Sequence, residues 1–162
     1  MTPRLAVPDD APAIARIHNE GIEDRVATFE TAKRTAEEAL EWLGGRYPVV
    51  VVEDEGKTIA FAAASAYDAR SSYEGVAEAS VYVAREARRR RAGHIALRAL
   101  IDECRKIGCW KLVGRIFSDN VASRALVSQL DFREIGTHRF HGKFDGEWKD
   151  VVVVERLIRE NL

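Results

Sequence analysis

Apolar residues recur at spacings of three and four over residues 92–108, and this stretch has the clearest periodic pattern in the chain. Such spacing places the apolar side chains on one face of an α-helix, so it predicts an amphipathic helix that Gly108 ends. Three other stretches also predict helices, because each joins good helix formers or an apolar stripe to capping residues. These stretches are 8–22, 35–46 and 118–130.

Short apolar or alternating runs predict strands at seven places along the chain. The runs are 4–7, 47–54, 57–67, 77–84, 110–117, 132–144 and 147–158. The stretch DEGK and the pair Asp145–Gly146 are turn signals that would join two of these strand pairs as hairpins. The predicted order is strand, two helices, three strands, helix, strand, helix and two strands. This order indicates an α/β (α+β) fold, in which helices pack on the faces of a mixed sheet.

Composition narrows the class of protein further. The chain has 162 residues, of which 46% are apolar and 31% charged, as expected for one soluble globular domain. Its net charge of −1 argues against a sequence-independent nucleic-acid binder, which normally carries a broad basic excess. No apolar run approaches the roughly 20 residues that span a bilayer, and the first ten residues lack the apolar stretch of a secretory signal. We therefore expect a cytoplasmic protein without a membrane partner.

Two residue pairs are candidates for a metal or redox site. Cys104 and Cys109 have a spacing that matches no zinc or redox motif, and Cys104 falls on the apolar face of a predicted helix. His138 and His141 are close in the sequence, but a regular strand would send them to opposite faces. We therefore expect no metal.

An arginine run is the most unusual local feature. Residues Arg85 to Arg91 include five arginines, in the stretch REARRRRAGH. The run could be a nucleic-acid patch, a solvated charge run, or a loop that meets the phosphates of a cofactor. It lies between a predicted strand and the start of a predicted helix, where free backbone N–H groups and the helix dipole favour an anion. The third interpretation is therefore the strongest.

Five stretches together resemble a known family. They are IHNEGIEDRVATFET, ARSSYEGVAEASVYV, RRRRAGHIALRALI, SDNVASRALVSQLDF and DGEWKDVVVVERLI. Across nearly its whole length the chain resembles the GNAT acetyltransferases, and among them the phosphinothricin N-acetyltransferase branch, which includes the arsinothricin N-acetyltransferases. The resemblance implies the GNAT fold over residues 1–162: a single mixed, mostly antiparallel central sheet with helices on both faces.

The resemblance also implies an acetyl-CoA site. The family's loop motif falls on Arg88, Arg89, Arg90, Arg91, Ala92 and Gly93, and the backbone N–H groups from Arg88 to His94 would wrap the pyrophosphate. Arg91 stands where the first glycine of the motif is expected. We expect it to keep the ordinary negative φ of a helix start, whereas a positive φ there would cost strain of order 1 kcal/mol. The backbone of Val81, Tyr82 and Val83 would pair with the pantetheine arm. Asn120 and Ser123 would contact the cofactor, although Asn120 could equally be only a helix cap.

Acid–base residues follow from the same resemblance. Alternation on the strand 77–84 places Glu78, Ser80 and Tyr82 on one face, and Glu78 matches the glutamate that the branch uses as general base. The other interpretation of Glu78 is an exposed strand glutamate. Val127 and Asp145 stand where relatives supply a tyrosine or histidine. A proton for the departing thiolate would therefore come from Tyr82, His141 or solvent, or the thiolate would leave unassisted.

The expected substrate follows from charge. Arg70 matches an arginine of the branch, with Tyr73 beside it, and an arginine can hold a carboxylate or phosphinate through two hydrogen bonds. Thr28, Phe29 and Arg25 match residues that line the same pocket, although Arg25 could equally be a surface arginine. Lys143 and Trp148 fall in the closing hairpin, where the branch commonly completes its pocket across a homodimer interface.

Three functions remain open at this point. The first is acetyl-CoA-dependent N-acetylation of an amino-acid-like antimetabolite of the phosphinothricin, arsinothricin or methionine sulfoximine type, by direct attack in a ternary complex, which would confer resistance. The second is acetylation of another amine, such as a polyamine or a protein terminus. The third is a non-catalytic acyl-CoA-binding or sensing protein.

Overall fold

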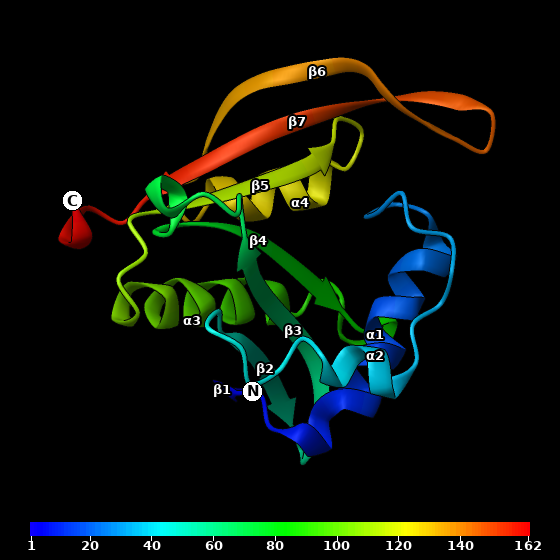
Figure 1. The fold of residues 1–162 in the computed structure, drawn as a ribbon. Coiled ribbons are helices and arrows are strands. Elements are labelled where there is room, and N and C mark those ends of the chain that lie inside the picture. The colour runs from blue at the N-terminus through cyan, green and yellow to red at the C-terminus, as the bar shows by residue number, and fades with distance from the viewer.

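The structure is a computed structural model that describes residues 1–162. Seven strands form one sheet in the order β1-β2-β3-β4-β5-β7-β6 (Figure 1). The strands are β1 (Thr2–Leu5), β2 (Val49–Asp54), β3 (Lys57–Ala66), β4 (Val76–Val83), β5 (Lys111–Phe117), β6 (Arg133–Phe144) and β7 (Glu147–Leu157). All neighbouring strands are antiparallel except β4 and β5, which are parallel. The expected mixed, mostly antiparallel sheet is confirmed.

Four α-helices cover the two faces of this sheet. They are α1 (Ala11–Asp24), α2 (Ala36–Leu40), α3 (Ala92–Lys106) and α4 (Val121–Ser128), and short 3₁₀ turns lie at Pro8–Asp10, Ser71–Tyr73, Arg85–Ala87 and Arg159–Asn161. Side chains of β4 show which face each helix covers. Tyr82 packs against His18 of α1, whereas Gly93 of α3 lies against Val83 and Val81 on the other face. The core between these layers consists mainly of aliphatic side chains and also contains Phe61 and Phe132.

The helix predicted over 35–46 is shorter than expected. Thr35 and Glu38 form the predicted capping box, but α2 ends at Leu40. Beyond it, Trp42 turns inward and packs on His18, with 5.2 Å between ring centroids, and on Phe61. Gly44 then adopts a positive φ of 76°. Aromatic packing against the core therefore overrides the local helix preference of this stretch.

The prediction for His138 and His141 was wrong. Their rings stack with centroids 4.3 Å apart. The register of β6 against β7 shifts between His138 and Gly142, and Phe140 within the shift has a φ of 49°. A β-bulge breaks the regular alternation of a strand, so it brings both histidines to the same side.

Candidate active site

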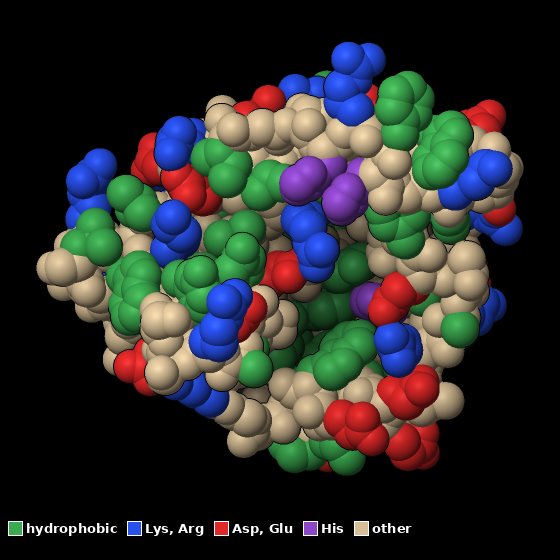
Figure 2. All heavy atoms as spheres, turned by 45° about the horizontal axis from the view of Figure 1, so that its top comes forward, with side chains coloured by type: hydrophobic (Ala, Val, Ile, Leu, Met, Phe, Trp, Pro, Cys, Tyr) green, Lys and Arg blue, Asp and Glu red, His purple; other side chains and the backbone are tan.

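A hollow opens where two parallel strands separate. β4 and β5 pair only from Val76 with Lys111 to Glu78 with Val113, while β5 continues to pair with β7 along its length. Beyond Glu78 the second edge of β4 therefore has no strand partner. Figure 2 shows a hollow in this face, with charged and histidine side chains at its rim and apolar side chains inside. Its volume is about 450 Å³. We call it the smaller hollow, because the hollow beside the arginine loop is larger.

The arginine loop lies beside a second, larger hollow of about 780 Å³. None of the backbone N–H groups from Arg89 to His94 donates a hydrogen bond to another group of the protein. Val81, Tyr82 and Val83 line the same hollow, together with Asn120 and Ser123. A row of free N–H groups at a helix start and an unpaired strand edge therefore face one continuous surface.

The backbone conformation of Arg91 differs from the expectation. Its φ is +68°, and that of Arg89 is +63°, so both residues adopt the left-handed conformation. The expected negative φ at Arg91 was wrong. Alternation of ordinary and left-handed residues turns successive N–H groups toward one side of the chain, which is the geometry of an anion-binding nest. This explains why a glycine is expected at position 91.

The four arginine side chains of the loop do not act alike. Arg88 binds Asp24 of α1 at 2.5 Å, and Arg90 binds Asp54 at the end of β2 at 2.6 Å. Arg89 and Arg91 have no ion pair, and both line the larger hollow, as does Arg88. Arg90 is not among the lining residues of this hollow, so its side chain takes no part in this surface.

Asn120 is a helix cap, as one of the two interpretations of the sequence expects, and it also lies where a cofactor contact is possible. Its Oδ1 accepts a hydrogen bond from the Ser123 N–H at 3.1 Å, which caps α4, and its Nδ2 donates to the Val26 carbonyl at 3.0 Å. The residue also lines both hollows. Asn120 is therefore a cap that fixes the start of α4 at the junction between the two hollows.

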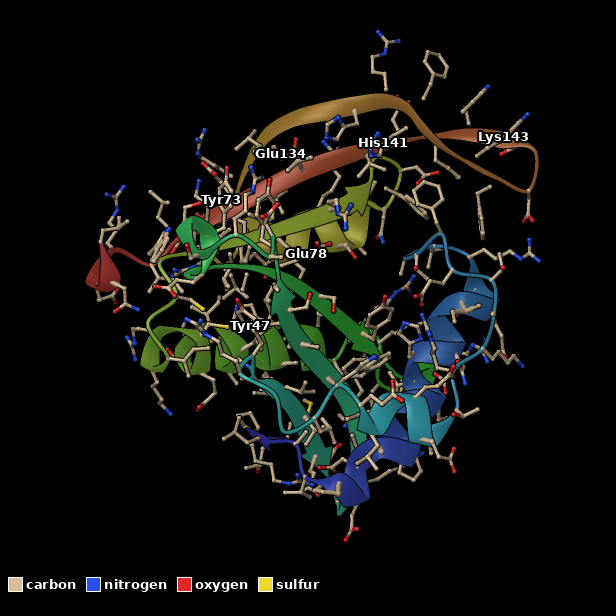
Figure 3. All side chains as sticks on the ribbon, viewed as in Figure 1. Tyr47, Tyr73, Glu78, Glu134, His141 and Lys143 are labelled. Carbon is tan, nitrogen blue, oxygen red and sulfur yellow. The ribbon has the colours of Figure 1, made fainter.

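Glu78 lies at the point where β4 and β5 diverge. Its side chain is 30% exposed and lines the smaller hollow, as expected for a candidate base. Its Oε1 accepts two hydrogen bonds from Arg115 of β5, from Nε at 3.0 Å and from Nη2 at 2.7 Å. Figure 3 shows Glu78 at the junction of the two strands, with His141 above it on β6. Sequence reasoning missed Arg115, although a charge inside an apolar strand was a signal.

Tyr82 stands between the smaller hollow and an aromatic cluster. Its ring stacks on Phe61, with centroids 5.2 Å apart and an interplanar angle of 15°. Burial, followed by the nearby Glu30 carboxylate, raises the pKa of Tyr82 to about 12. The phenol is therefore protonated at neutral pH and can donate a hydrogen bond.

A third cavity of about 420 Å³ lies beyond Tyr82 and shares Glu30, Ser80 and Tyr82 with the smaller hollow. Trp42, Tyr47 and Phe61 supply its aromatic lining. His18 at its base is buried, and burial lowers the pKa of this imidazole, so His18 is neutral. Sequence reasoning did not single out this cavity, because its wall comes from α1, β3, β4 and two loops that are far apart in the chain.

The predicted substrate residues are not all brought together. Thr28 and Phe29 line the smaller hollow, and a Cβ placed on Gly142 of β6 would lie 2.4 Å from the Phe29 ring. Arg25 lines the larger hollow and pairs with Asp145 of the β6–β7 turn. Phe29 therefore packs closely against the β6–β7 hairpin, and both Phe29 and Gly142 line the smaller hollow.

The other predicted substrate residues lie outside these hollows. The Arg70 side chain is 71% exposed, pairs with Asp68 at 2.8 Å and lies over the Tyr73 ring. Lys143 lies over the Trp148 ring near the tip of the β6–β7 hairpin (Figure 3). Neither Arg70, Tyr73 nor Lys143 lines any of the three hollows. In this chain, their contact with a substrate stays a prediction.

The residues present fit acetyl-CoA as a cosubstrate. The free N–H groups and the unpaired arginines match a diphosphate, and the open edge of β4 matches an extended amide chain. Gly93 also allows a close approach, because a Cβ there would lie 3.1 Å from Val83. No group of three or more His, Cys, Asp or Glu side chains is placed to hold a metal ion. None of the helices is long and apolar enough to cross a membrane.

Comparison with known proteins gives the family. Residues 14–132 match the acetyltransferase (GNAT) family. The chain is 32% identical over 161 residues to a phosphinothricin N-acetyltransferase of Alcaligenes faecalis, covering 96% of this chain and 81% of that protein. It is 28% identical over 165 residues to an L-methionine sulfoximine/L-methionine sulfone acetyltransferase of Salmonella typhimurium, covering 99% and 96%.

A solved structure extends this similarity to the fold. It is a GNAT phosphinothricin acetyltransferase from Sinorhizobium meliloti in complex with acetyl-CoA. The TM-score is 0.90 at 33% identity, and the match covers 96% of this chain and 87% of that one. Three observations indicate the same family: β4 and β5 separate, the arginine loop has free N–H groups, and the chain is similar to these acetyltransferases. The chain therefore belongs to the GNAT acetyltransferase family, in the phosphinothricin N-acetyltransferase branch, and is an N-acetyltransferase.

Proposed function

We propose that this enzyme transfers the acetyl group of acetyl-CoA to the amine of an amino-acid-like antimetabolite, by direct attack in a ternary complex. The observation that carries the proposal is the position of Glu78. Its carboxylate lies at the point where the open edge of β4 begins, and this edge leads to the arginine loop. A carboxylate that can accept a proton thus lies next to the surface that fits the acyl donor.

The reaction needs a base because an ammonium group has no lone pair for attack. Glu78 accepts the proton of the incoming amine, directly or through a water molecule. The acyl donor supplies a thioester carbonyl, and the amine nitrogen forms the new bond to its carbon while the bond to sulfur breaks. No covalent attachment to the enzyme is required, since the two hollows adjoin along the open edge of β4 and bring both substrates together there.

Tyr82 assists the departing sulfur as a hydrogen-bond donor. A thiol has a pKa of about 8.5, well below the value of about 12 for Tyr82. The thiolate is therefore too weak a base to remove the phenolic proton. Tyr82 stabilises the thiolate by a hydrogen bond, and the proton comes from solvent or from His141, which also lines the hollow. Val127 at the aligned position has no proton to donate.

The substrate class is proposed from the relatives. Those named above act on phosphinothricin and on methionine sulfoximine or sulfone. Acetylation removes the basic amine of such compounds, and we propose detoxification as the purpose. A turnover screen with phosphinothricin, arsinothricin, methionine sulfoximine and a polyamine tests this. We expect acetylation of the amino acids, and a preference for the polyamine would contradict it.

The same screen separates an enzyme from a sensor. A non-catalytic acyl-CoA-binding protein would release no free thiol from acetyl-CoA with any amine, whereas an enzyme releases one thiol for each amide formed. Glu78 at the strand junction favours the enzyme. The arginine loop serves the acyl donor in this proposal and not nucleic acid, because Arg88 and Arg90 are already paired with carboxylates.

We further propose a cytoplasmic homodimer. Ile135, Phe140 and Trp148 are large apolar side chains exposed on β6 and β7. β6 is an edge strand of the sheet, with one side open to another chain. A second copy that covers this hairpin would bury these side chains, so sedimentation is expected to show a dimer.

Arg91→Gly tests the role of the loop. We expect the loop to keep this left-handed backbone with and without the cofactor, so glycine should relieve strain in the free protein and in the complex alike. Strain relief therefore changes folding stability and leaves affinity unchanged. Loss of the charge should weaken acetyl-CoA binding by about 1 kcal/mol, or roughly fivefold, with a smaller loss at high salt. Calorimetric titration at two salt concentrations measures this.

Arg90→Ala is the matched control for this variant. Arg90 is the neighbouring arginine, but it binds Asp54 and its side chain does not line the larger hollow. Its loss should leave acetyl-CoA affinity within about twofold. A tighter complex with the Arg91→Gly variant would show that the strain acts only in the bound state.

A further inference from the structure

The ion pair between Arg115 and Glu78 leaves part of each group free. Arg115 directs Nε and Nη2 to a single oxygen, Oε1 of Glu78. Its Nη1 has no partner in the protein, and Oε2 of Glu78 accepts no hydrogen bond. A guanidinium has five N–H donors, so a second anion can bind to the free edge while the pair with Glu78 persists. The Arg115 side chain is 57% exposed and lines the smaller hollow, so this edge is accessible.

Arg115 is the only lysine or arginine that lines this hollow. The other titratable side chains around it are Glu30, Glu78, Tyr82 and His141. Glu30 is held by Arg34 at 2.7 Å and lies 3.2 Å from His18. Glu30 is therefore already paired, and no other carboxylate in the hollow competes for Arg115. An anionic ligand in this hollow has one cation to bind.

From this juxtaposition we infer that Arg115 binds the carboxylate of the substrate and that the adjacent Glu78 receives its amine. An α-amino acid carries an ammonium and a carboxylate on one carbon. A guanidinium and a carboxylate held side by side are complementary to that arrangement. The pair also positions the substrate for reaction. Arg115 anchors the carboxylate, and the nitrogen that must lose a proton then lies at Glu78.

This inference deepens the proposed function and rests on it, and it replaces Arg70 as the anchor. Arg70 is the anion-binding residue expected from the resemblance, but its guanidinium binds Asp68 through Nε and Nη2 and lines none of the hollows. Both oxygens of Asp68 are used in that pair. A substrate in the hollow with Glu78 therefore meets Arg115 and does not meet Arg70.

Methionine sulfone and its methyl ester are the probes. The sulfone group is uncharged, so the carboxylate is the only anion of the acid and the ester has none. Arg115→Ala should raise the KM for methionine sulfone by about tenfold or more, and Arg115→Lys should recover part of this loss. For the methyl ester, Arg115→Ala should change KM by no more than about twofold.

The two substrates separate recognition from other effects of the substitution. Removing Arg115 also removes the partner of Glu78, which affects kcat for the acid and the ester alike. Only a change in anion recognition alters the ratio of the KM for the acid to the KM for the ester. Arg70→Ala is the matched control and should leave this ratio unchanged. If Arg70→Ala changes the ratio and Arg115→Ala does not, Arg70 is the anchor and the inference is wrong.

A binding measurement makes the test independent of turnover. Methionine sulfone is titrated into the complex with CoA, for the wild type and for Arg115→Ala. We expect binding by the wild type that weakens about tenfold or more in the variant, even if no amine is acetylated. If methionine sulfone binds in this way but the amine screen shows no turnover, the proposed function is wrong and the role of Arg115 in binding stands. Equal binding by both proteins, or no binding by the wild type, would overturn the role of Arg115. An unchanged affinity for acetyl-CoA shows that the variant is folded.

Discussion

Replacing Glu78 with glutamine should lower kcat/KM for the amine by about 100-fold or more at neutral pH. The amide has nearly the shape of the carboxylate but cannot accept a proton. The deficit should shrink as the pH rises, because more of the amine is then neutral before it binds. Initial rates of thiol release between pH 6.5 and 9.5 measure both effects. Loss of the partly exposed pair with Arg115 should cost at most about 1 kcal/mol of stability.

Glu134→Gln is the matched control for this substitution. Glu134 is also a strand glutamate paired with an arginine, since both of its oxygens accept hydrogen bonds from Arg124. It lies on β6 and lines none of the hollows (Figure 3). Its loss should change kcat/KM by no more than about twofold. Near-normal turnover by the Glu78→Gln enzyme at neutral pH would remove Glu78 from the mechanism.

Phe61→Ala should lower the free energy of unfolding by about 3–5 kcal/mol. Phe61 of β3 is 1% exposed and lies between the rings of Tyr82 and Trp42. Alanine would leave a cavity under Tyr82, and the surrounding sheet cannot close it completely. Urea denaturation measures the change, and the midpoint of thermal unfolding should fall by roughly 10 °C.

Leu162→Ala provides the comparison on the surface. Leu162 is 70% exposed and lies outside the hollows and the proposed dimer interface, so this substitution should change stability by about 0.5 kcal/mol or less. The Phe61 variant should also bind the amine less well, since Phe61 supports the ring of Tyr82 at the wall of the hollow. A loss of stability below about 1 kcal/mol would mean that Trp42 and Tyr82 repack into the vacated space.

Most secondary structure was predictable because its signals are local. The periodic stripe over 92–108 became α3, and the alternating or apolar runs became the seven strands. The turn signals at Glu55–Gly56 and Asp145–Gly146 also hold, since all four residues have a positive φ. The stretch after Leu40 was mispredicted, because Trp42 gains more by packing on Phe61 than by continuing a helix.

The candidate site was predictable only in part. The strand with Glu78 and the loop with Gly93 were found because both are contiguous motifs in the sequence. The positive φ at Arg91 was not, because the type of residue there favours the opposite conformation. The β-bulge that stacks His138 on His141 likewise depends on the register of two strands, which short-range alternation does not show.

By itself the sequence determined the elements, their order, the family resemblance and the position of a candidate base on β4, because periodicity, caps and motifs act between residues that are close in the chain. Only the tertiary structure decided which cation faces that base. Glu78 and Arg115 are 37 residues apart and meet because β4 and β5 are parallel neighbours that diverge just beyond them. Arg70 is closer to Glu78 in the sequence, yet its side chain turns to Asp68 and solvent. Strand pairing and side-chain direction set these distances, and neither can be read from a single stretch of residues.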